Sequence, residues 1–281
     1  VHLNSAVDIP IRGTPESRFL PTAEGIKERI SETRVLILNS PLNPTGTCYT
    51  RNELAAICDV VLEENSKRKV AGVKPVMLVY DQVYSTMTAK GGSHVHPVQV
   101  RPEIFEFTIT LDAISKSLTA TGLRLGWMAI PPVLAPPVIA LIGHMGSWPA
   151  RPIQFAAAKT YSNPQTLEKY FSDLDMKISE RMEVLFSRLD AMKAEGLPVN
   201  YIPPEGGIYL STQFNLFELL DVKTNEEIRK WLLDEAGVAV VPFQAFGLEE
   251  DTGWFRISIG AVSVQEIVEA MNRLEEAINQ I

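Results

Sequence analysis

Two apolar runs joined by a short charged link constrain this chain more than any other feature. The first run, residues 104–111, contains several β-branched residues and predicts a buried strand. The second run, residues 125–130, predicts another strand. The link between them leaves little room for the crossover of roughly a dozen residues or more that parallel strands need. We therefore expect the second strand to run antiparallel to the first in one sheet.

The link carries two cations, Lys116 and Arg124, and the antiparallel arrangement places both at the same edge of the sheet. A lysine just beyond a buried strand is unusual, because burying an ammonium is costly unless it is paired or used. Its amine can form a Schiff base with an aldehyde, and a guanidinium fork suits a phosphate. An aldehyde and a phosphate occur together in pyridoxal 5'-phosphate (PLP), so the pair predicts a site for this cofactor.

Other polar residues follow two further buried strands, which we expect at residues 35–38 and 75–79. Asn43 lies in the turn-rich loop after the first, and Asp81 and Tyr84 come at the end of the second. A helical pattern separates these strands, so the order indicates an α/β layered domain. Because ligands of such sheets bind outside the carboxyl ends of the strands, we expect these side chains to converge on one ligand with the lysine of the link.

The later part of the chain predicts a second, smaller domain. A long amphipathic helix is expected over residues 163–195, and a helix of this length usually extends beyond one domain. We place the boundary within it, giving a large domain of residues 1–180 and a small domain of residues 181–281. Short strands at 208–211, 238–241 and 254–259 alternate with helices at 225–235 and 264–279, which predicts an α+β domain.

Composition excludes several classes of partner. The net charge of -8 argues against nucleic acid or an anionic membrane as the main partner. The apolar stretch at residues 127–143 is interrupted by prolines, so no transmembrane helix of about twenty residues fits there. The two cysteines give no disulfide framework, which fits a reducing compartment, and we expect a cytoplasmic protein. The start at Val1 does not resemble a signal peptide and suggests a processed chain or a fragment.

Four motifs, in this order and at these spacings, make the chain resemble the class I/II aminotransferases, which are fold-type-I PLP-dependent enzymes. They are Asn39-Ser-Pro-Leu-Asn43-Pro-Thr-Gly46, Asp81-Gln-Val-Tyr84, Ser115-Lys116 with Gly122-Leu-Arg124-Leu-Gly126-Trp127, and Phe255-Arg256-Ile-Ser258. The chain looks like the C-terminal two-thirds of a family member. The resemblance implies a large α/β domain with a mostly parallel sheet, one antiparallel strand and a missing N-terminal part, followed by a smaller α+β domain.

The resemblance also implies an activity: a PLP-dependent aminotransferase that moves an amino group between an L-amino acid and a 2-oxo acid. Lys116 would form the Schiff base and carry the proton between the substrate Cα and the cofactor. Asp81 would keep the pyridine nitrogen protonated, and Tyr84 would hydrogen-bond to the phenolic oxygen. These three residues are the expected catalytic set, and all three also bind the cofactor.

The remaining expected site residues bind the ends of the two ligands. By the same resemblance, Arg124 clamps the phosphate of PLP, and Arg256 binds the α-carboxylate of the substrate. Asn43 contacts both the cofactor and the substrate. Family members usually form homodimers with the active site at the interface, so a homodimer is expected. Arg151, in the sequence Trp148-Pro-Ala-Arg-Pro, either contacts a substrate side chain or is a solvated arginine.

Simpler interpretations of single residues stand beside these roles. Lys116 alone would be read as a lysine that extends along the surface, and Asp81 alone as a residue that closes a turn. Arg256 in an alternating strand would pair with a surface carboxylate. His94 and His96 have no further metal ligand nearby, so a loop is favoured over a metal site.

Two alternatives to the aminotransferase hypothesis stay open. The same site would serve another fold-type-I reaction, such as β-elimination of a sulfur amino acid by a C–S lyase, or ring closure of a sulfonium amino acid. The second alternative is a non-catalytic fragment, because the chain shows no upstream Gly-rich turn for the phosphate and has Ala113 where many family members have a serine. The sequence does not predict which amino acid or 2-oxo acid would be used.

Overall fold

The computed structural model describes residues 5–89 and 92–281, and these form two compact units. Unit 1 comprises the chain up to Pro41, Cys48–Met87 and Ser93–Phe171. Unit 2 comprises Leu42–Thr47, the described part of Thr88–Gly92, and Ser172–Ile281. The short loop that contains Asn43 therefore folds with the C-terminal unit. The functional roles expected for residues 1–180 and 181–281 stay predictions.

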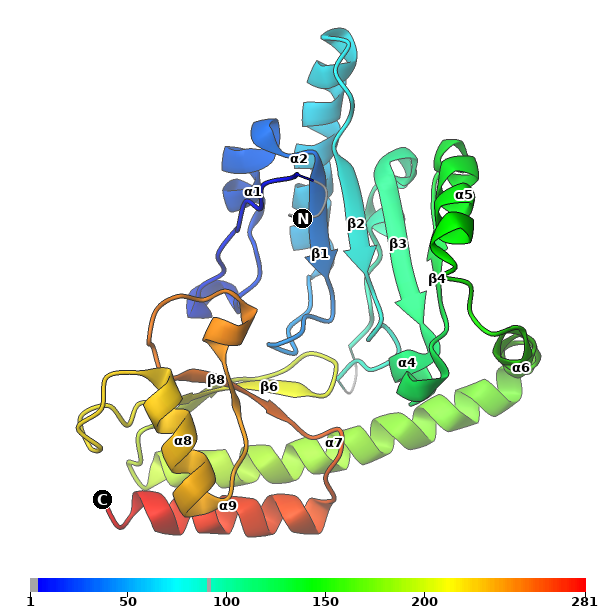
Figure 1. The fold of residues 1–281 in the computed structure, drawn as a ribbon. Helices are drawn as coiled ribbons and strands as arrows, with labels where there is room; N and C mark the ends of the chain where they lie inside the picture. The colour runs from blue at the N-terminus through cyan, green and yellow to red at the C-terminus, as the bar shows by residue number, and fades with distance from the viewer. Residues whose placement is uncertain (1–4, 90–91) are drawn as a thin grey trace. The chain divides into compact units, whose positions relative to one another are not determined.

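Unit 1 is built on a four-stranded sheet in the order β1-β2-β3-β4 (Figure 1). The strands are β1 (Val35–Asn39), β2 (Met77–Asp81), β3 (Thr108–Ala113) and β4 (Gly126–Ala129). β1, β2 and β3 are parallel, and β4 is antiparallel to β3, which confirms the prediction from the short link. Because Ala113 pairs with Gly126, Lys116 and Arg124 leave the sheet at the same end.

Several helices belong to unit 1, and α2 lies along one face of β1 and β2 (Figure 1). They are α1 (Ala23–Arg29), α2 (Arg51–Val70), α3 (Pro97–Val100), α4 (Ile114–Ser117), α5 (Ala135–Met145) and α6 (Arg151–Tyr161). Thr50 is the N-cap of α2 and forms a reciprocal capping box with Glu53. The Asn65 side chain accepts from the Val76 N–H at 2.7 Å and donates to its carbonyl at 3.0 Å. This pair fixes the buried side of α2 to the start of β2.

The strand expected at residues 104–111 begins later than predicted. Pro102–Phe107 form a 3-10 helix, η4, and β3 starts only at Thr108. Pro102 suits the first helical position, and the Thr108 hydroxyl donates to the Ile104 carbonyl at 2.8 Å. The prediction for residues 104–107 was wrong because Ile104 is fully buried in this helix too, and an apolar run does not separate the two cases.

Unit 2 contains a second four-stranded sheet in the order β5-β6-β8-β7, with every pair antiparallel. Its strands are β5 (Val199–Ile202), β6 (Tyr209–Phe214), β7 (Val241–Pro242) and β8 (Trp254–Ser258), and its helices are α8 (Asn225–Ala236), α9 (Val264–Ile278) and part of α7 (Pro164–Ala194). The sequence did not predict β5. β7 is shorter than the expected strand at 238–241, and Val238 and Val240 instead pack into the core of the unit.

The proline-interrupted stretch at residues 127–143 is divided between elements. Its first part belongs to β4, and its second forms most of α5, which has proline in its first turn. Across the described ranges, we find no helix with both the length and the apolar character needed to cross a membrane.

Candidate active site

Lys116 lies on the single turn of α4, directly after the end of β3. Its side chain is half-buried, and Nζ is 5.5 Å from the centroid of the buried Tyr84 ring. Among the residues that the structure describes, no Asp or Glu is within ion-pair distance of Nζ. The simple surface-lysine interpretation does not match this environment, since a half-buried amine without an anion is costly unless a ligand uses it.

Asp81 is the last residue of β2, and the end of that strand is held from two sides. The Asp81 carbonyl accepts from the Ser40 N–H at 3.0 Å and from the Asn39 side-chain amide at 2.9 Å. The Val83 N–H donates to Asp81 Oδ1 at 3.0 Å, which closes the following turn. The turn therefore uses only Oδ1 and orients the carboxylate. Asp81 can close the turn and still bind a ligand through Oδ2.

Arg124 precedes β4 and has a left-handed backbone, with φ 52° and ψ 52°. This conformation is uncommon for a residue with a side chain and re-aims the chain as it enters β4. The guanidinium is exposed, and Nη1 donates to the Thr121 carbonyl at 3.0 Å. Because this acceptor is a backbone carbonyl, the charge of Arg124 stays available to an anion.

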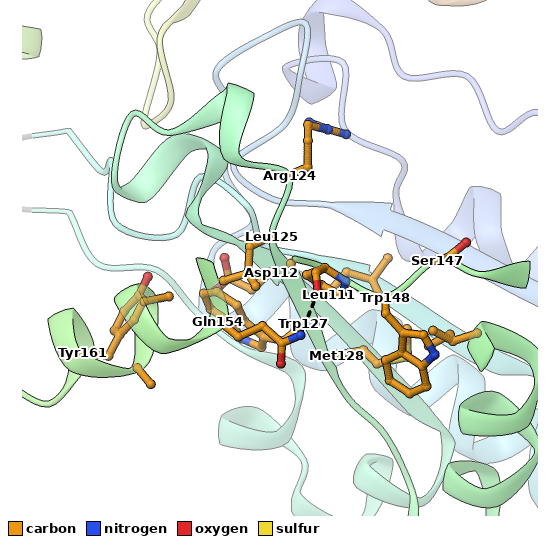
Figure 2. A pocket seen from close by; sticks show the side chains of 15 residues that line it. Leu111, Asp112, Arg124, Leu125, Trp127, Met128, Ser147, Trp148, Gln154 and Tyr161 are labelled. Carbon is orange, nitrogen blue, oxygen red and sulfur yellow. Dashed lines mark hydrogen bonds between the residues drawn. The ribbon is translucent and has the colours of Figure 1, made fainter. Parts of the chain in front are cut away.

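A cavity of about 790 Å³ lies beside β4 in unit 1 (Figure 2). Its wall includes Trp127, Trp148 and Tyr161, and the rings of Trp127 and Tyr161 pack edge to face with centroids 5.6 Å apart. Of the predicted site residues only Arg124 lines the cavity, and in Figure 2 its side chain extends away from the other labelled residues. The cavity is therefore not the predicted cofactor site, which we place at the sheet end instead.

A hydrogen-bonded chain of three side chains, His94, Gln82 and Asp112, lies at the end of β2 and β3. The Gln82 amide donates to Asp112 Oδ2 at 3.1 Å, so its oxygen accepts from His94 Nε2 at 3.2 Å. The Ala113 N–H donates to Asp112 Oδ1 at 2.7 Å. Burial raises the pKa of Asp112. The chain ties the loop after β2 to Asp112, two residues before α4, and so supports the backbone that carries Lys116.

His96 is also held by protein groups. The Val98 N–H donates to His96 Nδ1 at 3.2 Å, so its Nε2 donates to the Thr110 hydroxyl at 2.9 Å. Both histidine rings contact Tyr80, with ring centroids 5.9 Å away for His94 and 5.6 Å away for His96. The two histidines therefore join the loop after β2 to the sheet.

We expect His94→Gln to make unfolding less dependent on pH. Burial and the nearby His96 lower the pKa of His94 from its ordinary value of 6.5 to about 4. Between these two pH values the unfolded state binds a proton at His94 and the folded state does not. His94 therefore lowers the free energy of unfolding as pH falls from 6.5 towards 4. Since the ring keeps some contact with water, this loss is about 2 kcal/mol.

The measurement is urea denaturation of both proteins between about pH 7 and about pH 4. The advantage of the wild type over His94→Gln should shrink by about 2 kcal/mol across this range. An advantage that stays constant with pH would show that His94 is not held uncharged in the folded state.

Asn43 and Arg256 come together within unit 2. Arg256 Nη1 donates to Asn43 Oδ1 at 3.0 Å, and Arg256 lies on β8, one of the two inner strands of the sheet. Its Cζ is 4.5 Å from the centroid of the Tyr209 ring and 5.0 Å from that of Phe246. In the described part of the chain no carboxylate is within ion-pair distance of Arg256, so the expected alternative of a surface ion pair is not seen. The bond also fixes the orientation of the Asn43 amide, because its oxygen has to face Arg256.

The loop that carries Asn43 is fixed at Gly46. The Glu205 and Gly206 N–H groups donate to the Gly46 carbonyl at 2.7 and 2.8 Å. Gly46 has φ +72°, and a Cβ there would lie 2.4 Å from the Tyr209 carbonyl oxygen and 2.7 Å from Pro204 Cβ. Only glycine fits this approach, so Gly46 sets the position of Asn43 against β6.

The structure thus groups the predicted residues by unit. Unit 1 holds Lys116, Tyr84, Asp81 and Arg124 at one end of its sheet, and unit 2 holds the Asn43–Arg256 pair. Arg151 is the exposed first residue of α6, with Cζ 5.4 Å from the centroid of the Phe155 ring, and its role stays open.

Sequence reasoning missed four residues of these groups: Gln82, Asp112, Tyr209 and Phe246. Gln82 lies inside the strand-end motif Asp81-Gln-Val-Tyr84, so its place beside the site was available from the sequence. The contacts of Tyr209 and Phe246 depend on strand register and on a 3-10 turn, which no local pattern specified.

Comparison with known proteins gives the family. A profile described as "Aminotransferase class I and II" matches residues 1–274, which is nearly the whole chain. The chain belongs to the class I and II aminotransferase family. This confirms the resemblance based on the four motifs.

Relatives of this aminotransferase-family chain are similar over most of its length. An aspartate aminotransferase of Bacillus sp. (strain YM-2) is 31% identical over 99% of the chain, and a probable aspartate/prephenate aminotransferase of Aquifex aeolicus is 29% identical over 98%. The crystal structure of an aromatic aminotransferase from Pyrococcus horikoshii superposes with a TM-score of 0.84 at 28% identity, covering 97% of the chain and 67% of the relative. These likenesses confirm the fold-type-I prediction. The chain spans 66% of the Bacillus relative and 64% of the Aquifex one.

Proposed function

We propose that the protein is a PLP-dependent aminotransferase that moves an amino group between an L-amino acid and a 2-oxo acid. The observation that carries the proposal is the half-buried amine of Lys116, which has no acidic partner among the described residues and lies at the sheet end with Asp81 and Arg124. Family membership and the names of the relatives support the same reaction.

The residues of unit 1 fit PLP group by group. The amine of Lys116 suits the aldehyde, and the guanidinium of Arg124 suits the phosphate. Asp81 keeps one carboxylate oxygen for the pyridine nitrogen, since the Val83 N–H uses the other. Tyr84 lies beside Lys116 and suits the phenolic oxygen. Among the described residues, Lys116, Asp81 and Arg124 form no ion pair, so their charges stay available to such a ligand.

Each residue then has a physical task. PLP, when bound, supplies an aldehyde that links to amines and a ring that accepts the electron pair left when a bond at Cα breaks. Lys116 holds and moves the proton at the substrate Cα, and its place on α4 limits where the amine reaches. Asp81 keeps a proton on the ring nitrogen, so the ring stays electron-poor. Tyr84 orients the cofactor by hydrogen bonding, and Arg124 anchors the phosphate by charge-assisted bonds.

The Asn43–Arg256 pair of unit 2 is proposed to bind the α-carboxylate of the amino acid and of the 2-oxo acid. A guanidinium gives two parallel N–H donors that match a carboxylate, and the bond to Asn43 Oδ1 holds the guanidinium in place. The names of the relatives include aspartate, prephenate and aromatic amino acids. L-Aspartate is therefore the first substrate to assay.

Two further parts of the proposal concern the cell. We infer a homodimer from the family resemblance. A cytoplasmic location is supported by the cysteines, since neither Cys48 nor Cys58 forms a disulfide.

The test uses the native protein, loaded with PLP and then treated with borohydride. Peptide mass mapping should find the reduced cofactor on Lys116, and L-aspartate with 2-oxoglutarate should give oxaloacetate and glutamate. Release of pyruvate and ammonia from a sulfur amino acid, without transfer, would replace the proposal with an elimination reaction. Cofactor attached at another residue, or no attachment at all, would remove it in favour of a non-catalytic role.

A further inference from the structure

We infer that Tyr209 and Phe246 are positioning residues, which hold the guanidinium of Arg256 so that one carboxylate binds it end-on through Nη1 and Nη2. The inference rests on the proposed carboxylate-binding role of Arg256. All three residues belong to unit 2, so the geometry involved lies within one compact part of the chain.

The position of Tyr209 follows from strand register. Arg256 pairs with Ser211 of β6, and Ser258 pairs with Tyr209, so Tyr209 is the diagonal neighbour of Arg256 on the same face of the sheet. A diagonal neighbour of this kind is within reach of a long side chain, and Cζ of Arg256 lies 4.5 Å from the Tyr209 ring centroid. The backbone itself therefore places this ring against the guanidinium.

Phe246 reaches the same guanidinium from a different element. It ends the 3-10 helix η7 (Phe243–Phe246), which follows β7, and β7 pairs with β8 at Arg256 itself. The Phe246 ring centroid is 5.0 Å from Cζ. Phe246 is 37% exposed whereas Tyr209 is 7% exposed, so the first ring lies at the surface and the second belongs to the interior.

The hydrogen-bond donors of Arg256 are unequally available. Nη1 uses one N–H on Asn43 Oδ1, and Nε is buried without a partner among the described residues. A carboxylate can bind a guanidinium side-on through Nε and Nη2, or end-on through Nη1 and Nη2. Because Nε is not accessible, only the end-on mode remains.

Besides the two rings, Asn43 also contacts the guanidinium of Arg256, and the loop that carries Asn43 is fixed. The Ser211 hydroxyl donates to the Thr45 carbonyl at 3.4 Å, and the Gly46 carbonyl accepts two backbone N–H groups. Asn43 and the two rings therefore restrict the guanidinium before any ligand arrives. Binding then loses little side-chain entropy, and the ligand is a planar carboxylate that enters in the plane of the donors.

Aromatic rings attract a cation without using its N–H donors, so they hold Arg256 and leave its hydrogen bonds to the ligand. We expect the loss of either ring to weaken carboxylate binding by about threefold to thirtyfold. Rotation about the Nε–Cζ bond of Arg256 should also become faster, which a change in the general fold would not produce at this residue alone.

The experiment measures binding in the 281-residue chain, without catalysis. The chain is labelled with ¹⁵N-arginine, the Arg256 signals are assigned with Arg256→Lys, and pyruvate is added with uncharged pyruvamide as the matched ligand. We expect a saturable shift of the Nη signals with pyruvate only. Tyr209→Leu and Phe246→Leu should each weaken this binding and speed the rotation, while Tyr209→Phe, which keeps the ring, should restore both.

Tyr201→Leu is the matched control, because Tyr201 stacks on Phe186 at 5.3 Å and does not contact Arg256. It should leave pyruvate binding unchanged. Phe246→Leu alters a partly exposed residue, so it tests the inference even if Tyr209→Leu does not fold.

The inference is overturned if Phe246→Leu binds pyruvate with wild-type affinity and rotation rate, or if the Arg256 signals ignore pyruvate. The first outcome would overturn the positioning role alone, whereas the second would also remove the carboxylate-binding role proposed for Arg256. Pyruvate binding with the expected dependence on both rings, in a protein that transfers no amino group, would support the positioning role and remove the aminotransferase proposal.

Discussion

Replacing Lys116 with alanine is expected to lower the rate of amino transfer by about 10⁴-fold or more. The substitution removes the amine that attaches the cofactor and also the group that moves the proton at the substrate Cα. A positioned acid–base group alone contributes about 10²–10⁴-fold, so the loss of both tasks should reach or exceed the upper end. The measurement is a single-turnover reaction of the PLP-loaded protein with L-aspartate, followed by absorbance.

The environment of Lys116 sets the expected effect on stability. Its ammonium has no acidic partner among the described residues and contacts the Tyr84 ring, so its removal breaks no ion pair. We therefore expect the alanine variant to unfold at the wild-type urea concentration or slightly above it. Loss of rate without loss of stability would separate a chemical role from a structural one.

Lys69→Ala is the matched control, since Lys69 is an exposed lysine in the last turn of α2. This variant should keep the wild-type rate. A Lys116→Ala protein that retained more than about a tenth of the rate would contradict the proposed role of the amine.

Much of the fold could be predicted because it depends on local signals. The capping box of Thr50 and Glu53 marks the start of α2, and Pro164 marks the start of α7. The link between the two predicted strands, residues 112–124, barely reaches the length of a parallel crossover, so chain length favoured an antiparallel β4. Burial alone is a weaker signal, and at Ile104 it predicted a strand where η4 forms.

The contacts around the candidate site were less predictable because they join distant parts of the chain. Asn43 follows β1 in sequence, yet its loop folds into unit 2 because Gly46 is hydrogen-bonded to residues 205 and 206. The family resemblance implied that Asn43 and Arg256 both bind the substrate, but the sequence contained no signal that the loop of Asn43 folds into unit 2. The His94–Gln82–Asp112 chain likewise needs the register of β2 and β3, which periodicity does not specify.

Gly46→Ala is expected to destabilise the protein by about 2–4 kcal/mol. The left-handed backbone, with φ +72°, costs a residue with a side chain about 1 kcal/mol. The added Cβ would also come within 2.4 Å of the Tyr209 carbonyl oxygen, so the backbone has to move. Such overpacking typically costs about 1–3 kcal/mol.

Movement of this loop should also reach the proposed substrate site. The Glu205 and Gly206 N–H groups would lose a shared acceptor, and Asn43 would shift from Arg256 Nη1. We therefore expect pyruvate to bind the folded Gly46→Ala chain more weakly than the wild type. Urea denaturation measures the first effect, and the ¹⁵N-arginine titration measures the second.

Gly237→Ala separates the cost of the left-handed backbone from the cost of the close contact at Gly46. Gly237 has a similar backbone, with φ +63°, and also belongs to unit 2, but the atoms nearest to its added Cβ are 3.6 Å away on the Arg273 side chain. This control should lose only about 1 kcal/mol and should bind pyruvate like the wild type. Equal destabilisation of the two alanine variants would mean that the loop tolerates a side chain at Gly46. The close approach to β6 would then not be what holds Asn43 beside Arg256.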